Sequence, residues 1–542
     1  MNLRDAFKKA LSENGGVLPV IGKKISKPAN KAQTSIHPKK TSASKVIAMK
    51  LESDKNLSSS VQLSLNAKCL VQFSSNSIKP LKILDSKLGS MISINEIENP
   101  EIHELALGLD FGTSSVKVVI GDLASDKAYA VPFLEASGIE AFLMPSRVFE
   151  SVNSESIEDQ IFSLTNGVTA YRDLKLSLLA NPHSVEHQLA VIAFLSLVIA
   201  RARAWFFQKH KTIYKRVKCL WQLRVGLPST TAVGNKYASL FEKIARAAWK
   251  VSTYECVPTR KLVLKIHGEI FNMETFNDEL DVRVIPEIAA QIFGFVASSS
   301  FDKKAKNRYL MVDVGAGTVD SSLFKVTSGK GGKWNFEFYT AVVQPYGVSN
   351  LHAYRVEWWQ SQLSKIPKSN FLLNELQKTK YATDLEQNIP VYNRDYFDGV
   401  HFEKDHPDKV DSSFFEKKLL AQIQGSTLWR ANKDGFLATD QLKHTPMFLC
   451  GGGSRSPFYL ELENKLQNLS GYSWLSTEPW QLAFPNDLSA EDVEEVDFDR
   501  LSVAYGLSKV DVGEVTQALP LPKVINSSQQ SFISRYVDKE LT

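Results

Sequence analysis

Three glycine-rich turns contain the residues of this sequence that are best suited to chemistry, and the first begins at Gly108 in the segment GLDFGTSS. Gly112 has no side chain, so successive backbone N–H groups can converge there on a phosphate. Thr113 and Ser114 add hydroxyl donors. Asp110 would repel a phosphate, but its carboxylate suits Mg²⁺ held through water, or the orientation of an attacking water. This turn predicts a phosphate-binding hairpin.

The second turn repeats the pattern 203 residues later, from 110 to 313, where Asp313 ends a hydrophobic run. Its turn residues are Gly315, Ala316, Gly317 and Thr318. A single hairpin with an Asp–Gly turn is common, but two matched ones are a stronger signal. On opposite halves of a molecule they could hold a triphosphate from both sides, with Asp110 and Asp313 holding a magnesium ion between them.

The third turn, in the segment FLCGGGSRSP, is a buried run followed by glycines and the start of a helix. Its residues are Gly451, Gly452, Gly453, Ser454 and Arg455. Glycines there leave space for a flat base or a ribose, and an arginine can stack on a purine through its planar face. Alternatively, the glycines only permit tight packing between a strand and a helix.

In this order and at this spacing, the three segments resemble the phosphate-one, phosphate-two and adenosine motifs of the DnaK-type, seventy-kilodalton heat-shock proteins. The nucleotide-binding domain of that family shares its fold with actin and sugar kinases. Four further segments over roughly 105–512 resemble family motifs, namely Met144-Pro145-Ser146, Val225-Gly226-Leu227-Pro228, Ile285 to Ala290 and Ser502 to Gly506. The resemblance implies an ATP-binding protein with Mg²⁺ as a second cofactor.

The resemblance also suggests roles for residues outside the turns. Glu287 corresponds to the family's hinge glutamate near the metal, and Lys175 is the best candidate for the lysine that positions the attacking water. Glu375 and Lys378 lie in a segment that resembles the helix holding ribose and base. A surface lysine at 175 and an ordinary i,i+3 surface pair at 375 and 378 remain open alternatives.

Two features depart from the family. Ala316 replaces a glycine of the usual second phosphate turn, which could loosen the grip on phosphate and slow turnover. Only about 30 residues follow the last motif, too few for a peptide-binding sandwich domain and its helical lid. Peptide-clamp chaperone action is therefore not expected.

The elements that must position these turns are strands alternating with helices, which indicates an α/β protein. The expected fold is an actin-like ATPase fold with two ribonuclease-H-like lobes and an inserted lid subdomain. The expected division is a basic, flexible extension at 1–100, a first lobe at 101–300, a second lobe at 301–512 with an insertion at about 350–443, and a tail at 513–542. Apolar alternation near Val61 to Leu65 and Leu70 to Phe73 would suit strands. Helices are expected at 185–205, 235–249 and 288–297, and a hairpin at 309–326.

Composition is that of a soluble globular protein of more than one packed unit, with 542 residues, 43% hydrophobic and 23% charged. Residues 1–80 hold 14 Lys and Arg against 4 Asp and Glu, although the net charge of the whole chain is +5. Nucleic acid is not an expected partner, except through this basic arm. The four cysteines lie far apart and favour a reduced, cytoplasmic setting. The apolar run at 189–200 predicts a buried core helix rather than a membrane span.

The leading hypothesis is an ATPase whose two lobes close on nucleotide, with the closure read by an unidentified protein partner. A second is an actin-like protein that polymerises with ATP. A third is a small-molecule kinase, because GTSSVK also resembles the opening of sugar kinases. Binding of nucleotide without hydrolysis is a further alternative, because of Ala316.

Overall fold

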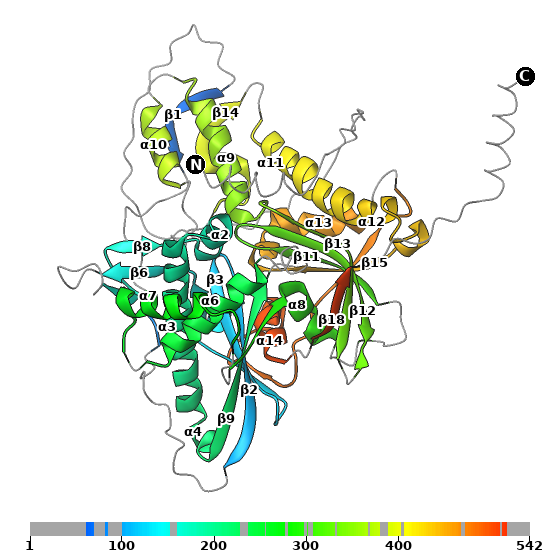
Figure 1. Ribbon diagram of the computed structural model, residues 1–542. Coiled ribbons are helices and arrows are strands. Elements are labelled where there is room, and N and C mark those ends of the chain that lie inside the picture. The colour runs from blue at the N-terminus through cyan, green and yellow to red at the C-terminus, as the bar shows by residue number, and fades with distance from the viewer. Residues whose placement is uncertain are drawn as a thin grey trace, which may run out of the picture.

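The computed structural model describes residues 61–69, 82–84, 100–151, 160–227, 237–254, 256–276, 280–296, 301, 307–330, 333–366, 369–379, 389–402, 406–467, 472–509 and 512–517. These ranges form a mixed α/β protein with two large sheets, as the alternation of strands and helices predicts. Figure 1 shows the two sheets beside each other, each with helices packed against it.

The first large sheet, here the N-terminal sheet, has seven strands in the order β10-β9-β2-β3-β4-β17, with β5 paired to β3. β2, β3 and β4 are consecutive antiparallel strands, whereas β9 and β10 continue the sheet in parallel. Their bounds are Glu101–Phe111 (β2), Ser115–Asp122 (β3), Lys127–Ala130 (β4), Met144–Pro145 (β5), Val217–Leu227 (β9), Asp281–Pro286 (β10) and Leu488–Ser489 (β17). The predicted first hairpin is therefore present.

Helices cover this sheet: α2 (Leu174–Ala180), α3 (Val185–Lys209), α4 (Lys211–Tyr214), α6 (Ala238–Ser252) and α7 (Arg260–Phe271). α3 begins after Ser184, whose hydroxyl accepts a hydrogen bond from the backbone of His187. By length and composition alone α3 could cross a membrane, but most of it is buried against its neighbours in this protein. It packs as a core helix, as the sequence predicts.

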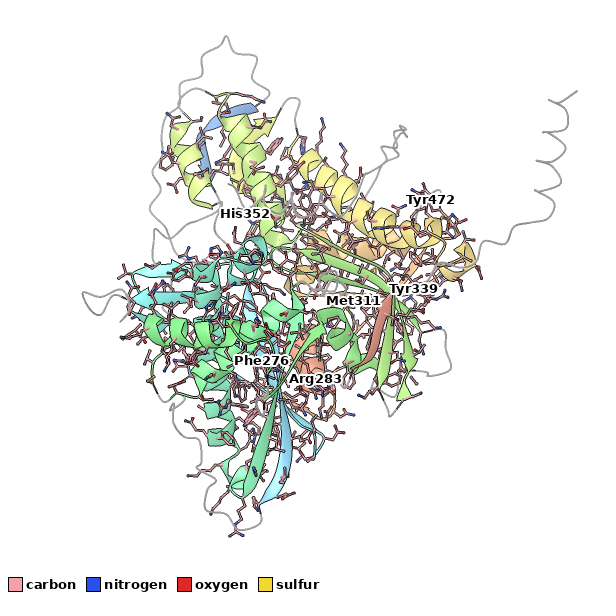
Figure 2. The ribbon with its side chains drawn as sticks, in the orientation of Figure 1. Phe276, Arg283, Met311, Tyr339, His352 and Tyr472 are labelled. Atoms are coloured by element: carbon pink, nitrogen blue, oxygen red, sulfur yellow. The ribbon has the colours of Figure 1, made fainter. Side chains whose placement is uncertain are left out.

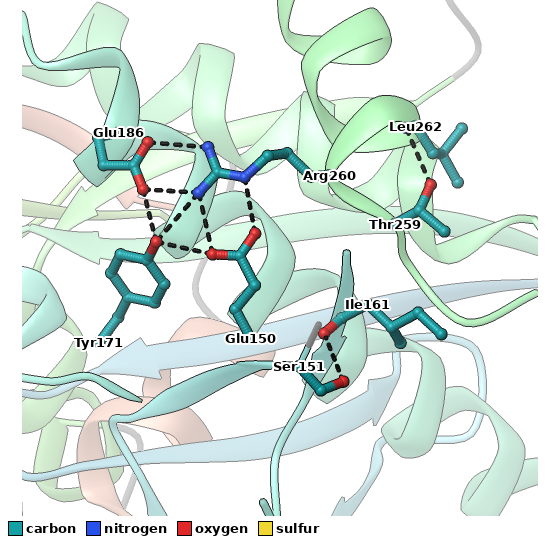
Figure 3. Close-up of polar contacts among 8 residues, drawn as sticks. All are labelled: Glu150, Ser151, Ile161, Tyr171, Glu186, Thr259, Arg260 and Leu262. Atoms are coloured by element: carbon teal, nitrogen blue, oxygen red, sulfur yellow. Dashed lines mark hydrogen bonds and ion pairs between the residues drawn. The ribbon is translucent and has the colours of Figure 1, made fainter. Parts of the chain in front are cut away.

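A small sheet with strand order β7-β6-β8 is tied to α3 and α7 by one arginine. The strands are Val148–Ser151 (β6), Ile161–Ser163 (β7) and Thr169–Tyr171 (β8). Figure 3 shows Arg260 between two carboxylates, with Nε 2.6 Å from Oε1 of Glu150 and Nη2 2.7 Å from Oε1 of Glu186. The Tyr171 hydroxyl lies within hydrogen-bonding distance of both carboxylates. Because each of these side chains is bound by the others, we assign them a structural role.

The second large sheet, here the C-terminal sheet, has six strands in the order β16-β15-β11-β12-β13-β18. They are Arg308–Val314 (β11), Val319–Ser328 (β12), Trp334–Gln344 (β13), Thr445–Cys450 (β15), Thr477–Trp480 (β16) and Val512–Gln517 (β18). β11 and β12 form the predicted second hairpin. β18 pairs with β13, so the sheet extends to residue 517, beyond the boundary expected at 512.

β11 is buried on both faces, and its residues alternate between two cores. Tyr309 and Met311, of which Figure 2 labels Met311, pack with α8 (Glu287–Val296) on one face. Leu310 and Val312 pack on the other face with α11 (Asp408–Phe414), the π-helix η6 (Phe415–Trp429) and α13 (Pro457–Gln467). The short α12 (Arg430–Lys433) follows η6. The insertion expected at 350–443 is therefore narrower, because 408–433 covers the sheet itself.

The segment 348–402 forms a smaller subdomain with its own hydrophobic core. It contains α9 (Val348–Leu363), α10 (Asn370–Thr379), the 3₁₀ helix η5 (Asn393–Tyr396) and β14 (Phe397–Phe402). His352 (Figure 2) contacts the Tyr396 hydroxyl through Nδ1 at 2.6 Å and so joins α9 to η5. Arg355 is buried and pairs through Nε with Oδ1 of Asp411 at 2.7 Å, which joins the subdomain to α11.

The N-terminal extension takes part in the fold at two places, contrary to the expectation of a flexible arm. Residues Val61–Cys69 form β1, which pairs antiparallel with β14 of the subdomain. Ile83 bridges Leu134 beside the N-terminal sheet. The expected strand near Val61 is thus confirmed, whereas the one near Leu70 and most of the basic arm lie outside the described residues. Unpaired backbone groups on β14 would explain why a distant segment is recruited.

Deleting residues 1–69 should unpair one edge of β14 without unfolding the two large sheets. Backbone amides of Phe397–Phe402 should then exchange with deuterium roughly tenfold faster or more, because they lose protected hydrogen bonds to β1. Hydrogen-exchange mass spectrometry measures this, with Thr477–Trp480, an edge strand far along the chain, as the internal control. Unchanged exchange at 397–402 would contradict the pairing.

α8 and α14 (Ser502–Lys509) lie between the two large sheets (Figure 1). α8 belongs to the core of the C-terminal sheet, although it precedes the boundary expected at residue 300. β17 and α14 pack on the N-terminal sheet, although they follow that boundary. The chain therefore crosses between the sheets three times in the described elements: from β10 to α8, from β16 to β17, and from α14 to β18.

Candidate functional site

The first turn, at residues 112–114, is fixed by Ser146 from β5's end. The Ser146 hydroxyl donates to the Gly112 carbonyl at 2.7 Å, and its backbone N–H donates to the Ser114 carbonyl at 2.9 Å. Two carbonyls of the turn are therefore held by the protein. The N–H groups of Thr113 and Ser114 have no hydrogen-bond partner among the described residues, which leaves them free for a ligand.

The second turn, at residues 315–318, is fixed in the same way by the N-terminus of α9. The N–H groups of Val348 and Ser349 donate to the carbonyls of Gly315 and Ala316 at 3.2 and 2.8 Å. Gly347 must be a glycine here, because a Cβ would lie 2.5 Å from both carbonyl oxygens. In the described part of the chain, the N–H groups of Ala316 and Gly317 lack partners. The alanine at 316 thus leaves the donors free.

The structure brings the two turns together. A Cβ placed on Gly317 would lie 3.4 Å from Cγ2 of Thr113 and 3.0 Å from Cδ1 of Leu176. Leu176 is in the first turn of α2, directly after Lys175. Free backbone donors from both sheets therefore border one small space.

The two hairpins share a register that places a carboxylate opposite the residue seven positions later. Asp110 at the end of β2 faces Lys117, whose Nζ donates to Oδ2 of Asp110 at 2.9 Å. Asp313 at the end of β11 faces another carboxylate, Asp320. Like charges directly opposite each other repel, so the second hairpin carries negative charge that no cross-strand partner neutralises.

Lys175 and Glu287 form a buried ion pair across the two halves of the protein. Nζ of Lys175, in the first turn of α2, lies 2.6 Å from Oε1 of Glu287, the first residue of α8. Burial lowers the pKa of Lys175, but the Glu287 carboxylate outweighs it and the pKa is raised overall. Burial raises the pKa of Glu287, as does the nearby Asp110, while Lys175 opposes them. The sequence alternative of a surface lysine at 175 is wrong, because Lys175 is 5% exposed.

Asp313 and Asp320 are the carboxylates whose protonation is most affected. Burial raises the pKa of Asp313 to about 6, and the charges of Glu287 and Asp110 add to the effect. Burial, Glu287 and Asp313 raise the pKa of Asp320 as well. Two lysines accompany these four carboxylates, so the site is short of positive charge. This arrangement favours a bound cation.

The site has oxygen atoms that could accept hydrogen bonds from the water molecules around a magnesium ion. Buried Oδ1 of Asp320 and Oε1 of Gln291 have no hydrogen-bond partner, and Nε2 of Gln291 donates to Oδ2 of Asp313 at 3.2 Å. Within the described ranges, no three His, Cys, Asp or Glu side chains are placed to ligate a metal directly. Oxygen ligands and water-mediated contacts are what Mg²⁺ prefers, so the residues fit it.

The third turn lies against the end of β11. A Cβ on Gly451 would lie 2.2 Å from Oδ1 of Asp313, and φ at Gly451 is 85°, so only glycine fits. The Ser454 hydroxyl donates to the Gly451 carbonyl at 2.7 Å. Arg455 is held by two carboxylates, with Nη2 2.7 Å from Oδ1 of Asp497 and 2.6 Å from Oδ1 of Asp499. This turn is therefore next to the second hairpin. The two carboxylates fix the orientation of the Arg455 guanidinium plane.

The last two candidates lie on α10 (Asn370–Thr379), in the subdomain 348–402. Glu375 lies on α10, which packs against α9 and β1. The side chain of Lys378 lies outside the described residues.

Sequence reasoning missed four residues of the site. Lys117 and Asp320 could have been found, because a hairpin with a known turn fixes which residues face each other across its strands. Gln291 and Asp499 carry no such signal, since their neighbours come from distant segments.

No match was found when the sequence was compared with protein-family models and with curated proteins. The function of the site must therefore be argued from its own chemistry.

Proposed function

We propose that this protein is a Mg²⁺-dependent ATPase with an actin-like fold, in which the two large sheets are the cores of two ribonuclease-H-like lobes. The subdomain 348–402 would be the inserted lid. The observation that carries the proposal is the close approach of Gly317 to Thr113, where a Cβ on Gly317 would lie 3.4 Å from Cγ2 of Thr113, so that backbone donors from two matched hairpins lie near each other. The DnaK-like motifs lie at this contact and around it, which supports the same assignment.

The free N–H groups of both turns would bind the terminal phosphates, with Thr113 and Thr318 donating through their hydroxyls. Asp110 and Asp313 would hold Mg²⁺ through water; when bound, the ion supplies positive charge to the phosphates. Asp110, Asp313 or Lys175 would orient the water that attacks the γ-phosphate, and Glu287 keeps Lys175 in place. The glycines at 451–453 would accommodate the nucleoside, and Arg455 would stack on the base.

Nucleotide would act as a switch because it contacts both lobes. Contacts from the two hairpins to one triphosphate favour a closed arrangement, and loss of the γ-phosphate removes part of them. We propose that a cytoplasmic protein partner reads this difference. Nothing in the site requires a nucleic acid or a membrane.

Titration calorimetry of the purified protein with ATP and ADP tests the proposal. Both nucleotides should bind with Mg²⁺, and affinity for ATP should fall roughly tenfold or more in EDTA. Single-turnover assays should show ADP and phosphate as products. Absence of ATP binding in the presence of Mg²⁺ would refute the proposed site.

Further experiments on the purified protein distinguish the nucleotide-dependent switch from a filament-forming protein and from a small-molecule kinase. Pull-downs with ATP, with ADP and without nucleotide should differ in the captured partner. Sedimentation of the protein with ATP would favour a filament instead, and ATP consumption stimulated by a sugar or polyol would favour a kinase.

A further inference from the structure

Arg500 is a cation beside the third turn that has no partner in the described protein. It is the last residue of the 3₁₀ helix η9 (Glu495–Arg500), directly before α14. A Cβ on Gly452 would lie 2.9 Å from its Cζ and 3.0 and 3.2 Å from its two Nη atoms. The guanidinium therefore lies against the backbone of the glycine turn, and a side chain at 452 would displace it.

The neighbouring Arg455 explains why Arg500 is unpaired. Arg455 uses both Asp497 and Asp499, and the second oxygen of Asp499 also accepts the backbone N–H of Gly451 at 3.1 Å. For Arg500, no hydrogen bond or ion pair occurs within the described ranges. Burial lowers the pKa of Arg500, and the charge of Arg455 lowers it further, while the charges of Asp499, Glu140 and Asp110 oppose this. A partly buried guanidinium that no described carboxylate contacts directly is costly, which points to a ligand that carries negative charge.

We propose that Arg500 binds the phosphate next to the nucleoside, the α-phosphate of the bound adenine nucleotide. This inference rests on the proposed nucleotide site. The two hairpin turns supply the free donors for the terminal phosphates, so these do not need Arg500. The guanidinium lies instead on Gly452, in the turn where the nucleoside is expected. An arginine can donate two parallel hydrogen bonds to one phosphate and also carries a positive charge. The backbone N–H groups of a glycine turn can donate hydrogen bonds but carry no full charge.

Adenosine, AMP and ADP distinguish this role, because only the last two carry an α-phosphate. Arg500→Gln should weaken AMP and ADP binding roughly tenfold or more, the loss of a charge-assisted pair, and leave adenosine within about twofold. The ADP affinity of Arg500→Lys should lie between those of wild type and Arg500→Gln, since a lysine keeps the charge but not the paired donors. Competition against a fluorescent ADP analogue measures all three ligands. Arg394→Gln is the matched control, since Arg394 is an exposed arginine paired with Asp408.

Thermal unfolding is a second test, because its expected result differs from the result for an arginine with only a structural role. Ligand-free Arg500→Gln should melt at or above the wild-type temperature, because an unpaired cation has been removed, while the rise produced by ADP should be smaller. A lower melting temperature with equal weakening of adenosine and ADP would assign Arg500 to structure and overturn the inference. Full ADP affinity in Arg500→Gln would overturn it while leaving the nucleotide site intact. If wild type bound none of the three ligands, the proposed site and this role would both be rejected.

Discussion

Asp313→Asn should make the ligand-free protein more stable at pH 8 by up to about 3 kcal/mol, and it should also reduce ATP hydrolysis roughly 100-fold or more. The pKa of Asp313 is raised from the ordinary 3.8 to about 6. The folded state therefore binds this proton more tightly than the unfolded state does. As pH rises above about 6, the buried carboxylate is ionised beside Glu287 and Asp110, and the folded state loses stability. An asparagine has no charge to bury there.

Urea denaturation at two pH values checks the sign of this effect. The stability gain of Asp313→Asn should be largest at pH 8 and fall below about 1 kcal/mol near pH 4, where both folded and unfolded carboxyls bind protons. Equal or lower stability of the variant at pH 8 would show that the ionised Asp313 carboxylate does not destabilise the folded protein.

Asp110→Asn is the matched control for this prediction, since it makes the same chemical change in the other hairpin. Asp110 is paired with Lys117 at 2.9 Å, so its replacement leaves a mostly buried ammonium without its anion. This variant should keep its fold, lose hydrolysis and lose stability rather than gain it. Opposite stability changes with a common loss of turnover would separate a carboxylate that lacks a neutralising partner from one that Lys117 neutralises. Full hydrolysis by Asp110→Asn would reject its assigned role.

Local patterns account for the parts of the fold that could be predicted. The two hairpins, α3, α6 and α8 follow from hydrophobic periodicity and glycine turns within short segments. The same patterns do not show that α8 packs on the C-terminal sheet or that β17 completes the N-terminal one. β1 was weakly signalled as a strand, but its partner β14 lies more than 300 residues away, from 69 to 397. Such pairings depend on tertiary structure.

The candidate site shows the same division. The turn residues were identified because glycines and hydroxyl residues at a bend are a local signature. The excess of negative charge around Asp313 and Asp320 could not be identified in this way, because Glu287 and Asp110, which contribute to it, lie on other segments. Arg455 was expected to face a base, but its pairing with Asp497 and Asp499 became evident only from the structure. Because Arg455 pairs with Asp497 and Asp499, no ion pair to Arg500 forms within the described ranges.

Gly506→Ala should destabilise the protein by about 3 kcal/mol or more, because Gly506 is where α14 crosses α8. A Cβ on Gly506 would lie 1.8 Å from the carbonyl oxygen of Ala290, so the helices would have to separate. α14 cannot retreat, since its backbone also lies against β2 and β3 through Gly108 and Gly121, where a Cβ would lie 2.3 Å from helix carbonyl oxygens. The crossing therefore sets the separation of the two sheets.

Gly268→Ala is the control for this substitution, because it makes the same change inside helix α7, where a Cβ would meet nothing within 4 Å. It should stabilise the protein by up to about 1 kcal/mol through helix propensity. The distance between the two turns depends on the α8–α14 crossing, so any folded Gly506→Ala protein should also bind ATP more weakly, measured by calorimetry at a temperature below its melting transition. Wild-type stability and affinity in Gly506→Ala would mean that the sheets can move apart without disturbing the contact between Gly317 and Thr113, and the crossing would then not be the element that positions the site.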